Sequence, residues 1–130
     1  MKESFTVSEH FNASPMEIYL AWLNSEKHSA MTGGVAKVSD LPGESYSAWD
    51  GYIYGKNIKL DPGKLIVQSW RTNEFGAVEE DSQVEVILEP ENSGTRLTLN
   101  HTNIPETQFG YKDGWKEYYF TNMKTYFSNR

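Results

Sequence analysis

Histidine and arginine side chains are the groups in this sequence with the clearest capacity for chemistry. The three histidines, His10, His28 and His101, lack the short spacing that metal ligands share, and the chain contains no cysteine. The lack of cysteine excludes disulfides, thiolate metal sites and a cysteine nucleophile. We therefore expect no metal site and no cofactor.

His101 is the histidine whose position suggests a role. It alternates in phase with Leu97 and Leu99, so we expect its side chain on the covered face of a strand. One interpretation is an interior histidine with satisfied hydrogen bonds. The other is a general base in a cavity, because the reference pKa of about 6.5 suits proton transfer near neutrality. The second role needs an orienting carboxylate that the sequence does not identify, so we assign no catalytic residue.

Arg71 and a strip of acidic residues also have two interpretations each. Arg71 follows Trp70 at the end of an expected strand, where it forms a salt bridge, with Asp50 or Glu85 as partner, or anchors a ligand carboxylate. The acids between positions 79 and 91 are the solvated face of an outer strand or a surface for a basic partner.

Composition bounds the class of protein. The chain has 130 residues, of which 38% are hydrophobic and 23% charged, so we expect one globular domain over residues 1–130. The formal net charge of −6 repels phosphate backbones, which argues against nucleic acid as a partner. No stretch approaches the roughly 18 apolar residues of a membrane span, and the N-terminus has no apolar signal region. We expect no membrane insertion and a cytoplasmic location.

The elements that position these side chains follow from their patterns. Residues 4–11 alternate as a half-buried strand does, and Ser14, Pro15 and Glu17 form a capping box that begins a helix reaching about Asn24. From residue 33, short β-rich runs separated by Pro-Gly and Asp-Gly pairs predict an antiparallel meander. The strands at 82–90 and 95–101 each have one apolar face, which predicts a sheet covered on one side. The fold class is therefore α+β.

The last predicted element, residues 110–127, is unusually rich in rings. Seven of its eighteen residues are aromatic. At about 100° per residue, one helical stripe holds most of them: Tyr111, Trp115, Tyr118, Tyr119, Asn122 and Tyr126. Phe120 and Phe127 fall outside this stripe. The rings are core, the lining of a cavity, or a surface for a partner. Because their hydroxyl, indole and amide groups need partners when buried, we favour a partly polar cavity.

Five stretches of the sequence resemble one family, in order and at suitable spacing. They are FNASPMEIYLAW (11–22), MTGG (31–34), WDGYIYGKNIKLDPGKLIVQSWR (49–71), GTRLTLNHTNIP (94–105) and GWKEYYF (114–120). They resemble the C-terminal domain of activators of the Hsp90 ATPase, within the START-like, Bet v 1-like helix-grip superfamily. This resemblance implies a curved antiparallel sheet of about six or seven strands around a long C-terminal helix, with a cavity between them.

The resemblance leaves three functions open. The superfamily binds lipids and other apolar molecules, so the first is a non-enzymatic domain with a small apolar ligand, lipid-like or aromatic, in the cavity. The second is an Hsp90 co-chaperone; the family's co-chaperones carry a further N-terminal domain for which we see no room in this chain, so we expect little ATPase stimulation. The third is a cyclase or lyase using the same cavity. The expected ligand-binding residues are Trp49, Trp70, Val86, Leu99, His101, Trp115, Tyr119, Asn122 and Tyr126.

Overall fold

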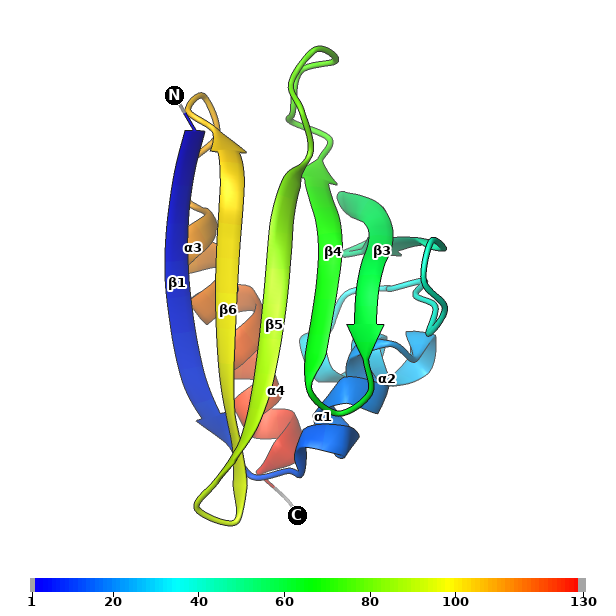
Figure 1. Ribbon diagram of the computed structural model, residues 1–130, viewed down its shortest axis with the longest axis vertical. Helices are drawn as coiled ribbons and strands as arrows, with labels where there is room; N and C mark the ends of the chain where they lie inside the picture. The colour runs from blue at the N-terminus through cyan, green and yellow to red at the C-terminus, as the bar shows by residue number, and fades with distance from the viewer. Residues whose placement is uncertain (1, 129–130) are drawn as a thin grey trace.

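A computed structural model describes residues 2–128 as a curved antiparallel sheet with helices packed on one of its faces (Figure 1). The strands are β1 (Lys2–Phe11), β2 (Ser45–Ala48), β3 (Ile53–Asp61), β4 (Leu65–Thr72), β5 (Ser82–Glu91) and β6 (Gly94–Pro105). The helices are α1 (Pro15–Trp22), α2 (Ser25–Thr32), α3 (Tyr111–Gly114), the π-helix η1 (Trp115–Phe120) and α4 (Thr121–Phe127). The six strands lie in the order β1-β6-β5-β4-β3-β2. This arrangement confirms the predicted α+β helix-grip fold.

Helix α1 begins where the capping box predicts. The Ser14 hydroxyl accepts a hydrogen bond from the Glu17 backbone N–H at 3.1 Å, and the Glu17 carboxylate accepts one from the Ser14 N–H at 3.3 Å. The pair satisfies two N–H groups that the first helical turn leaves without partners. The helix ends at Trp22, so the predicted end at Asn24 is about two residues too late.

Helix α2 was not predicted. It starts at the Asn24 cap, whose side-chain oxygen accepts the Lys27 N–H at 2.9 Å. Its buried residues are His28, Met31 and Thr32. Their spacing is helical, but two of the three are polar, so the segment lacks the apolar stripe that indicates an amphipathic helix.

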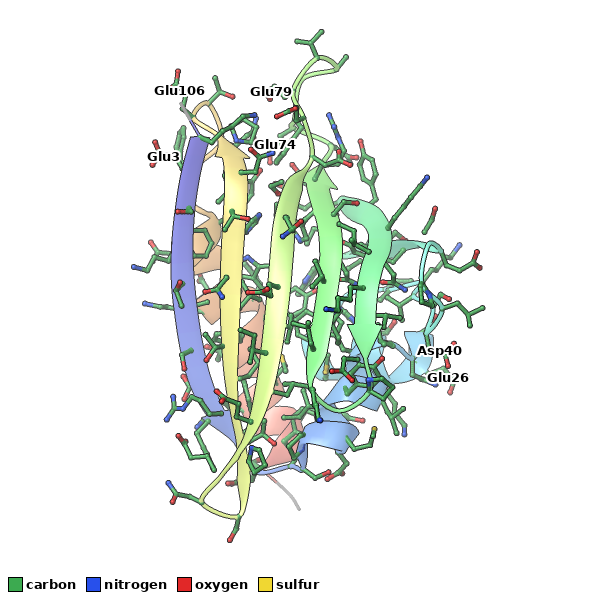
Figure 2. The ribbon with its side chains drawn as sticks, viewed as in Figure 1. Glu3, Glu26, Asp40, Glu74, Glu79 and Glu106 are labelled. Carbon is green, nitrogen blue, oxygen red and sulfur yellow. The ribbon has the colours of Figure 1, made fainter. Side chains whose placement is uncertain are left out.

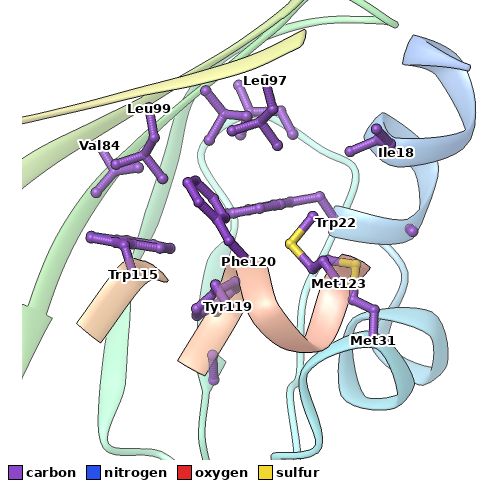
Figure 3. Close-up of a cluster of buried hydrophobic side chains, with 14 of the residues drawn as sticks. Ile18, Trp22, Met31, Val84, Leu97, Leu99, Trp115, Tyr119, Phe120 and Met123 are labelled. Carbon is purple, nitrogen blue, oxygen red and sulfur yellow. The ribbon is translucent and has the colours of Figure 1, made fainter. Parts of the chain in front are cut away.

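Strands β5 and β6 confirm that the sheet is covered on one side. Val86 of β5 lies opposite Leu99 of β6, and Val84 lies opposite His101. All four side chains are buried. The residues that alternate with these in the middle of the two strands are at least partly exposed: Glu85, Ile87, Thr98 and Asn100. The helices lie together on one face of the sheet (Figure 1), and the close-up in Figure 3 shows Val84 and Leu99 on the side of the sheet that faces Trp115 of η1.

Gly55 of β3 lets two strands approach closely where the sheet bends. A Cβ atom at this position would lie 2.1 Å from the backbone oxygen of Ser69 in β4. The Ser69 hydroxyl also accepts the Lys56 N–H at 2.9 Å, which fixes β3 against β4. The backbone therefore has no room for a side chain at residue 55, as expected for glycine in a strand near another backbone.

Replacing Gly55 by alanine should therefore destabilise the protein. Because the obstacle is a backbone atom, the strands must separate, and we expect a loss of roughly 1–3 kcal/mol in unfolding free energy. Urea denaturation followed by circular dichroism measures this loss. Gly76→Ala is the matched control, because its Cβ would find its nearest neighbour at 3.6 Å, in the Glu79 side chain. Equal stability of the two variants would contradict the close-approach argument.

Candidate functional site

An open pocket of about 510 Å³ lies between the sheet and the C-terminal helical segment. This volume falls in the range of about 300–1,000 Å³ that is typical of small-molecule sites. Its lining comes from the turn before β3, from β4, from the loop before α3, and from α3 and η1. The lining residues are Trp49, Tyr52, Ile53, Trp70, Phe109, Gly110, Tyr111, Gly114, Trp115, Tyr118 and Tyr119. Eight of the eleven are aromatic, so we refer to this set as the ring-lined pocket.

Trp49 reaches the pocket from a left-handed turn. Trp49, Asp50 and Gly51 have φ values of 51°, 58° and 86°. Left-handed backbone costs a non-glycine residue roughly 1–2 kcal/mol, so the surrounding contacts must hold this turn. The indole lies over Gly34, where a Cβ would come within 2.4 Å of the ring, and meets Tyr118 edge-on at 5.9 Å. Gly34 thus provides the space into which the strained turn places the indole.

The helical wall of the pocket contains a π-helical turn. Residues 111–127 are helical, as predicted, but in η1 the Thr121 N–H bonds to the Lys116 carbonyl, five residues earlier. An α-helix reaches back four residues, so a π turn takes up one extra residue. The helix thereby changes the face that its later residues present to the sheet.

The predicted inner stripe was consequently wrong for the second half of the segment. In that half Asn122 and Tyr126 are only partly buried, whereas Tyr118, in the middle of the segment, is exposed but lines the pocket. Phe120 and Phe127, predicted to lie outside the stripe, are buried with Met123. The extra residue gives positions 120, 123 and 127 the angular places that a continuous α-helix gives to 119, 122 and 126. Phe120 accordingly points toward the sheet residues around Leu97 (Figure 3).

Most polar atoms of the pocket lining have protein partners. The Tyr119 hydroxyl donates to His28 Nε2 at 2.8 Å, and the Tyr111 hydroxyl donates to Gln108 at 2.8 Å. The Tyr52 hydroxyl donates to the Glu74 carboxylate. The indole N–H of Trp49 is buried and has no partner within residues 2–128. The pocket thus offers a ligand mainly ring surface.

His101 is buried under the pocket and both of its ring nitrogens are used. Nδ1 accepts a hydrogen bond from the Trp115 indole N–H at 3.1 Å, and Nε2 lies 2.8 Å from the Ser82 hydroxyl. That hydroxyl donates to the Trp70 carbonyl at 2.6 Å, so Nε2 carries the proton. Burial lowers the pKa of His101 to about 3. This geometry matches an interior histidine with satisfied hydrogen bonds rather than a base facing a ligand.

Arg71 forms the salt bridge that one interpretation predicted, but with a different partner. Its guanidinium donates to Asp81 at 2.8 Å and to the carbonyls of Gly76 and Glu79 at 2.9 and 3.0 Å. The predicted partners Asp50 and Glu85 were therefore wrong. Arg71 crosses the base of the long β4–β5 loop, where it fixes the loop conformation and does not line the pocket.

The structure brings some of the nine predicted ligand-binding residues together and separates the others. Four of them line the ring-lined pocket: Trp49, Trp70, Trp115 and Tyr119. Three more are buried in the sheet and do not line it: Val86, Leu99 and His101. Asn122 instead donates to the Thr32 carbonyl of α2 at 2.7 Å, and Tyr126 packs edge-on against Phe127 at 4.9 Å.

Several lining residues were absent from the predicted site. They are Tyr52, Ile53, Phe109, Gly110, Tyr111, Gly114 and Tyr118. Tyr111 and Tyr118 were already in the predicted ring stripe, and Tyr52 and Ile53 follow the Asp-Gly turn beside Trp49. The sequence patterns could thus have predicted these four lining residues. No local pattern predicts that the loop residues Phe109 and Gly110 line the pocket.

Two absences within residues 2–128 complete the description of the site. No group of three histidine, aspartate or glutamate side chains in this range is arranged to hold a metal ion. No helix within it has the length and apolar character needed to cross a membrane.

Comparison with known proteins agrees with the resemblance seen in the sequence. The family model described as "Activator of Hsp90 ATPase homolog 1-like protein" matches residues 12–128. Among solved structures, an HSP90 activator from Plasmodium falciparum superposes with a TM-score of 0.85 at 23% identity and covers 96% of each chain. That likeness concerns the fold.

Two curated relatives are longer proteins. The activator of 90 kDa heat shock protein ATPase homolog of Dictyostelium discoideum is 30% identical over 128 residues, which cover 97% of this chain and 33% of the relative. Homolog 1 from Homo sapiens is 30% identical over 125 residues, which cover 94% of this chain and 36% of the relative. The chain thus spans about a third of the length of the curated relatives that it matches.

The two buried histidines should make stability depend on pH. Burial lowers the pKa of His101 to about 3 and that of His28 to about 4, although the hydrogen bond to the Trp22 carbonyl opposes the second shift. Because both folded-state values lie below the unfolded value of about 6.5, the unfolded chain binds protons first as pH falls. Between about pH 6.5 and its folded-state pKa, each histidine should lower the unfolding free energy by roughly 1.4 kcal/mol for every unit by which pH falls.

Urea unfolding at pH 7, 6 and 5 measures the slope of unfolding free energy against pH. At these pH values most carboxylates remain ionised, so they contribute little to the slope. His101→Gln and His28→Gln are each expected to reduce the slope by about half, since each removes one of two equivalent proton sites. Stability that stays constant from pH 7 to 5 would show that the histidines are not held neutral by burial.

Proposed function

We propose that this chain, which belongs to the family of activator of Hsp90 ATPase homolog 1-like proteins, is a binding domain for a small apolar molecule. The observation that carries this proposal is the ring-lined pocket of about 510 Å³ between the sheet and the C-terminal segment. Trp49, Trp70, Trp115 and Tyr119 are the binding residues that sequence and geometry share.

The chemistry of the lining favours binding of an apolar molecule. Rings cover most of the surface, and several of their polar atoms already bond to protein groups, as those of Trp115 and Tyr119 bond to His101 and His28. A ligand therefore gains free energy mainly by removing apolar surface from water, at roughly 25 cal/mol per Å². The mouth is open, so a ligand can enter without unfolding of either wall.

The geometry favours binding over catalysis. Both nitrogens of His101 are engaged in hydrogen bonds, and Arg71 is engaged at the base of the β4–β5 loop. The cyclase or lyase hypothesis required His101, Arg71 and an acid to meet in the cavity. Since these groups point to different parts of the molecule, we propose a binding role without catalysis.

Filling the pocket should abolish binding without unfolding the protein. Gly114 lines the pocket in helical conformation, and a Cβ there meets only Tyr118, at 4.0 Å. We expect Gly114→Leu to block ligands and to stabilise the helix slightly, because glycine costs a helix about 1 kcal/mol relative to alanine. Nuclear magnetic resonance titrations with fatty acids, sterols, flavonoid-like compounds and aromatic amines test this.

The four tryptophan indole signals serve as internal reporters. Those of Trp49, Trp70 and Trp115 should shift with saturation, and that of Trp22, which does not line the pocket, should shift least. Gly114→Ala is the matched control and should keep binding. If no compound produces saturable shifts in the unmodified protein, the proposed function fails.

A second candidate function is binding to an Hsp90-type chaperone. The observation in its favour is the 30% identity with relatives named as activators of the 90 kDa heat shock protein ATPase. The matched region is about a third of those relatives, so their activity enters here as a proposal. A cytoplasmic location, which suits such a partner and a chain without cysteine, is part of the proposal.

We expect the chain alone to bind Hsp90 weakly and to change ATP turnover less than about twofold, an effect near 0.4 kcal/mol. Titration into purified Hsp90 from the same organism, with calorimetry for binding and a coupled assay for turnover, measures both quantities. Several-fold stimulation would make chaperone activation the leading function. A lack of binding at high micromolar concentration would remove this candidate.

A further inference from the structure

The faces of aromatic rings give the pocket an electrostatic preference as well as an apolar surface. Each ring has a negative face, and tryptophan attracts a cation most strongly. Three of the lining residues are tryptophans: Trp49, Trp70 and Trp115. The rings are also closely spaced, since Trp70 lies 4.9 Å from Tyr111 and 5.9 Å from Trp115. A cation that enters this pocket would therefore lie among aromatic rings.

Two carboxylates are linked by hydrogen bonds to tyrosines that line the same pocket. Glu74 accepts the hydrogen bond of the Tyr52 hydroxyl, and Tyr52 lines the pocket. Glu79 accepts from Gln108, which in turn accepts from the Tyr111 hydroxyl. Burial raises the pKa of Tyr111, and the negative charges of Glu74 and Glu79 add to that rise. Both acids therefore act electrostatically on the lining.

Further acids lie at this end of the molecule. Figure 2 shows Glu3 and Glu106 at the same end as Glu74 and Glu79, whereas Asp40 lies well away from them. The formal charge of the whole chain is −6. A field of this sign raises the local concentration of cations and lowers that of anions.

The basic groups at this end do not neutralise the pocket. Arg71 is bound to Asp81 at 2.8 Å, and Lys2 pairs with Glu80 at 3.5 Å. Lys112 lines a neighbouring shallow hollow rather than the ring-lined pocket. None of the described residues that line the pocket is basic. An anionic ligand would therefore lose its hydration without gaining a counter-charge.

We propose that the ligand of this pocket is a small organic cation, an aromatic or alkyl ammonium whose apolar body fills the pocket and whose charged group lies among the ring faces near Glu74. This inference rests on the proposed function and narrows its ligand class. Glu74 is the positioning carboxylate, because its hydrogen bond to Tyr52 fixes its charge at the rim.

Three naphthalene compounds that differ in one substituent test the proposal by calorimetry. They carry an ammoniomethyl, a hydroxymethyl or a carboxylate group, so the substituents are similar in size and differ mainly in charge. We expect the cation to bind about tenfold more tightly than the alcohol, and the carboxylate to bind least. High salt should reduce the advantage of the cation, because it screens the contribution of the rim carboxylates.

Two variants distinguish the effect of a charge beside the pocket from the effect of the net charge of the protein. Glu74→Gln removes the rim charge and keeps an oxygen that accepts from Tyr52, and we expect it to reduce the preference for the cation about threefold. Asp40→Asn removes the same charge from an exposed site away from the pocket and should leave the preference unchanged. Thermal unfolding of both variants verifies that they remain folded.

Each outcome decides the inference. Tighter binding of the cation that depends on Glu74 supports it. Equal affinity for the three compounds, or tighter binding of the carboxylate, overturns the ligand class while the proposed binding function stands. An equal response of the two variants shows that net charge rather than Glu74 sets the preference. If none of the compounds nor any other apolar molecule binds, the proposed function itself fails.

Discussion

The hydrogen bond from the Trp115 indole to His101 Nδ1 is the contact on which the arrangement of sheet and helix depends. It joins the start of η1 to the buried face of β6, in surroundings where an unpaired polar atom would cost about 1–3 kcal/mol. It also fixes which nitrogen of His101 carries the proton, and thereby the bond to Ser82 and onward to the Trp70 carbonyl. With this chain complete, Trp115 has one position over the sheet, and the floor of the pocket is set.

The opposite wall contains a strained turn that is held by packing and by backbone hydrogen bonds, since the Asp50 N–H donates to the Val35 carbonyl at 2.9 Å and the Tyr52 N–H donates to the Trp49 carbonyl at 3.1 Å. Trp49 and Asp50 have left-handed backbone, which the packing of the indole over Gly34 must offset. Strained residues of this kind concentrate at functional sites, because only a constraint from the rest of the fold keeps them in place. Two separate constraints therefore position rings on the two sides of the pocket: the buried histidine network positions Trp115, and the left-handed turn positions Trp49.

Much of the fold could be predicted from the sequence, because its signals are local or periodic. The capping box at Ser14 and the alternation of β5 and β6 each depend on neighbours within a few residues or along one strand. The partner of Arg71 could not be predicted, since it depends on how the β4–β5 loop returns to the sheet. Helix α2 lacked an apolar stripe. In the site, the abundance of tyrosine and tryptophan predicted a pocket lined by aromatic rings. Which residues face that pocket depends on the π turn of η1, and no residue type indicates a π turn.

The π turn of η1 also has a consequence for how this chain should be compared with its relatives. One residue between Trp115 and Phe120 is surplus to a continuous α-helix, so a homologous chain that is one residue shorter here would still bury the equivalents of Phe120, Met123 and Phe127. An alignment gap inside this helix would then be structurally correct, although gaps in helices are usually treated as errors. An alignment without a gap would instead match Tyr126 to the core position that Phe127 fills, and would assign conservation to the wrong ring.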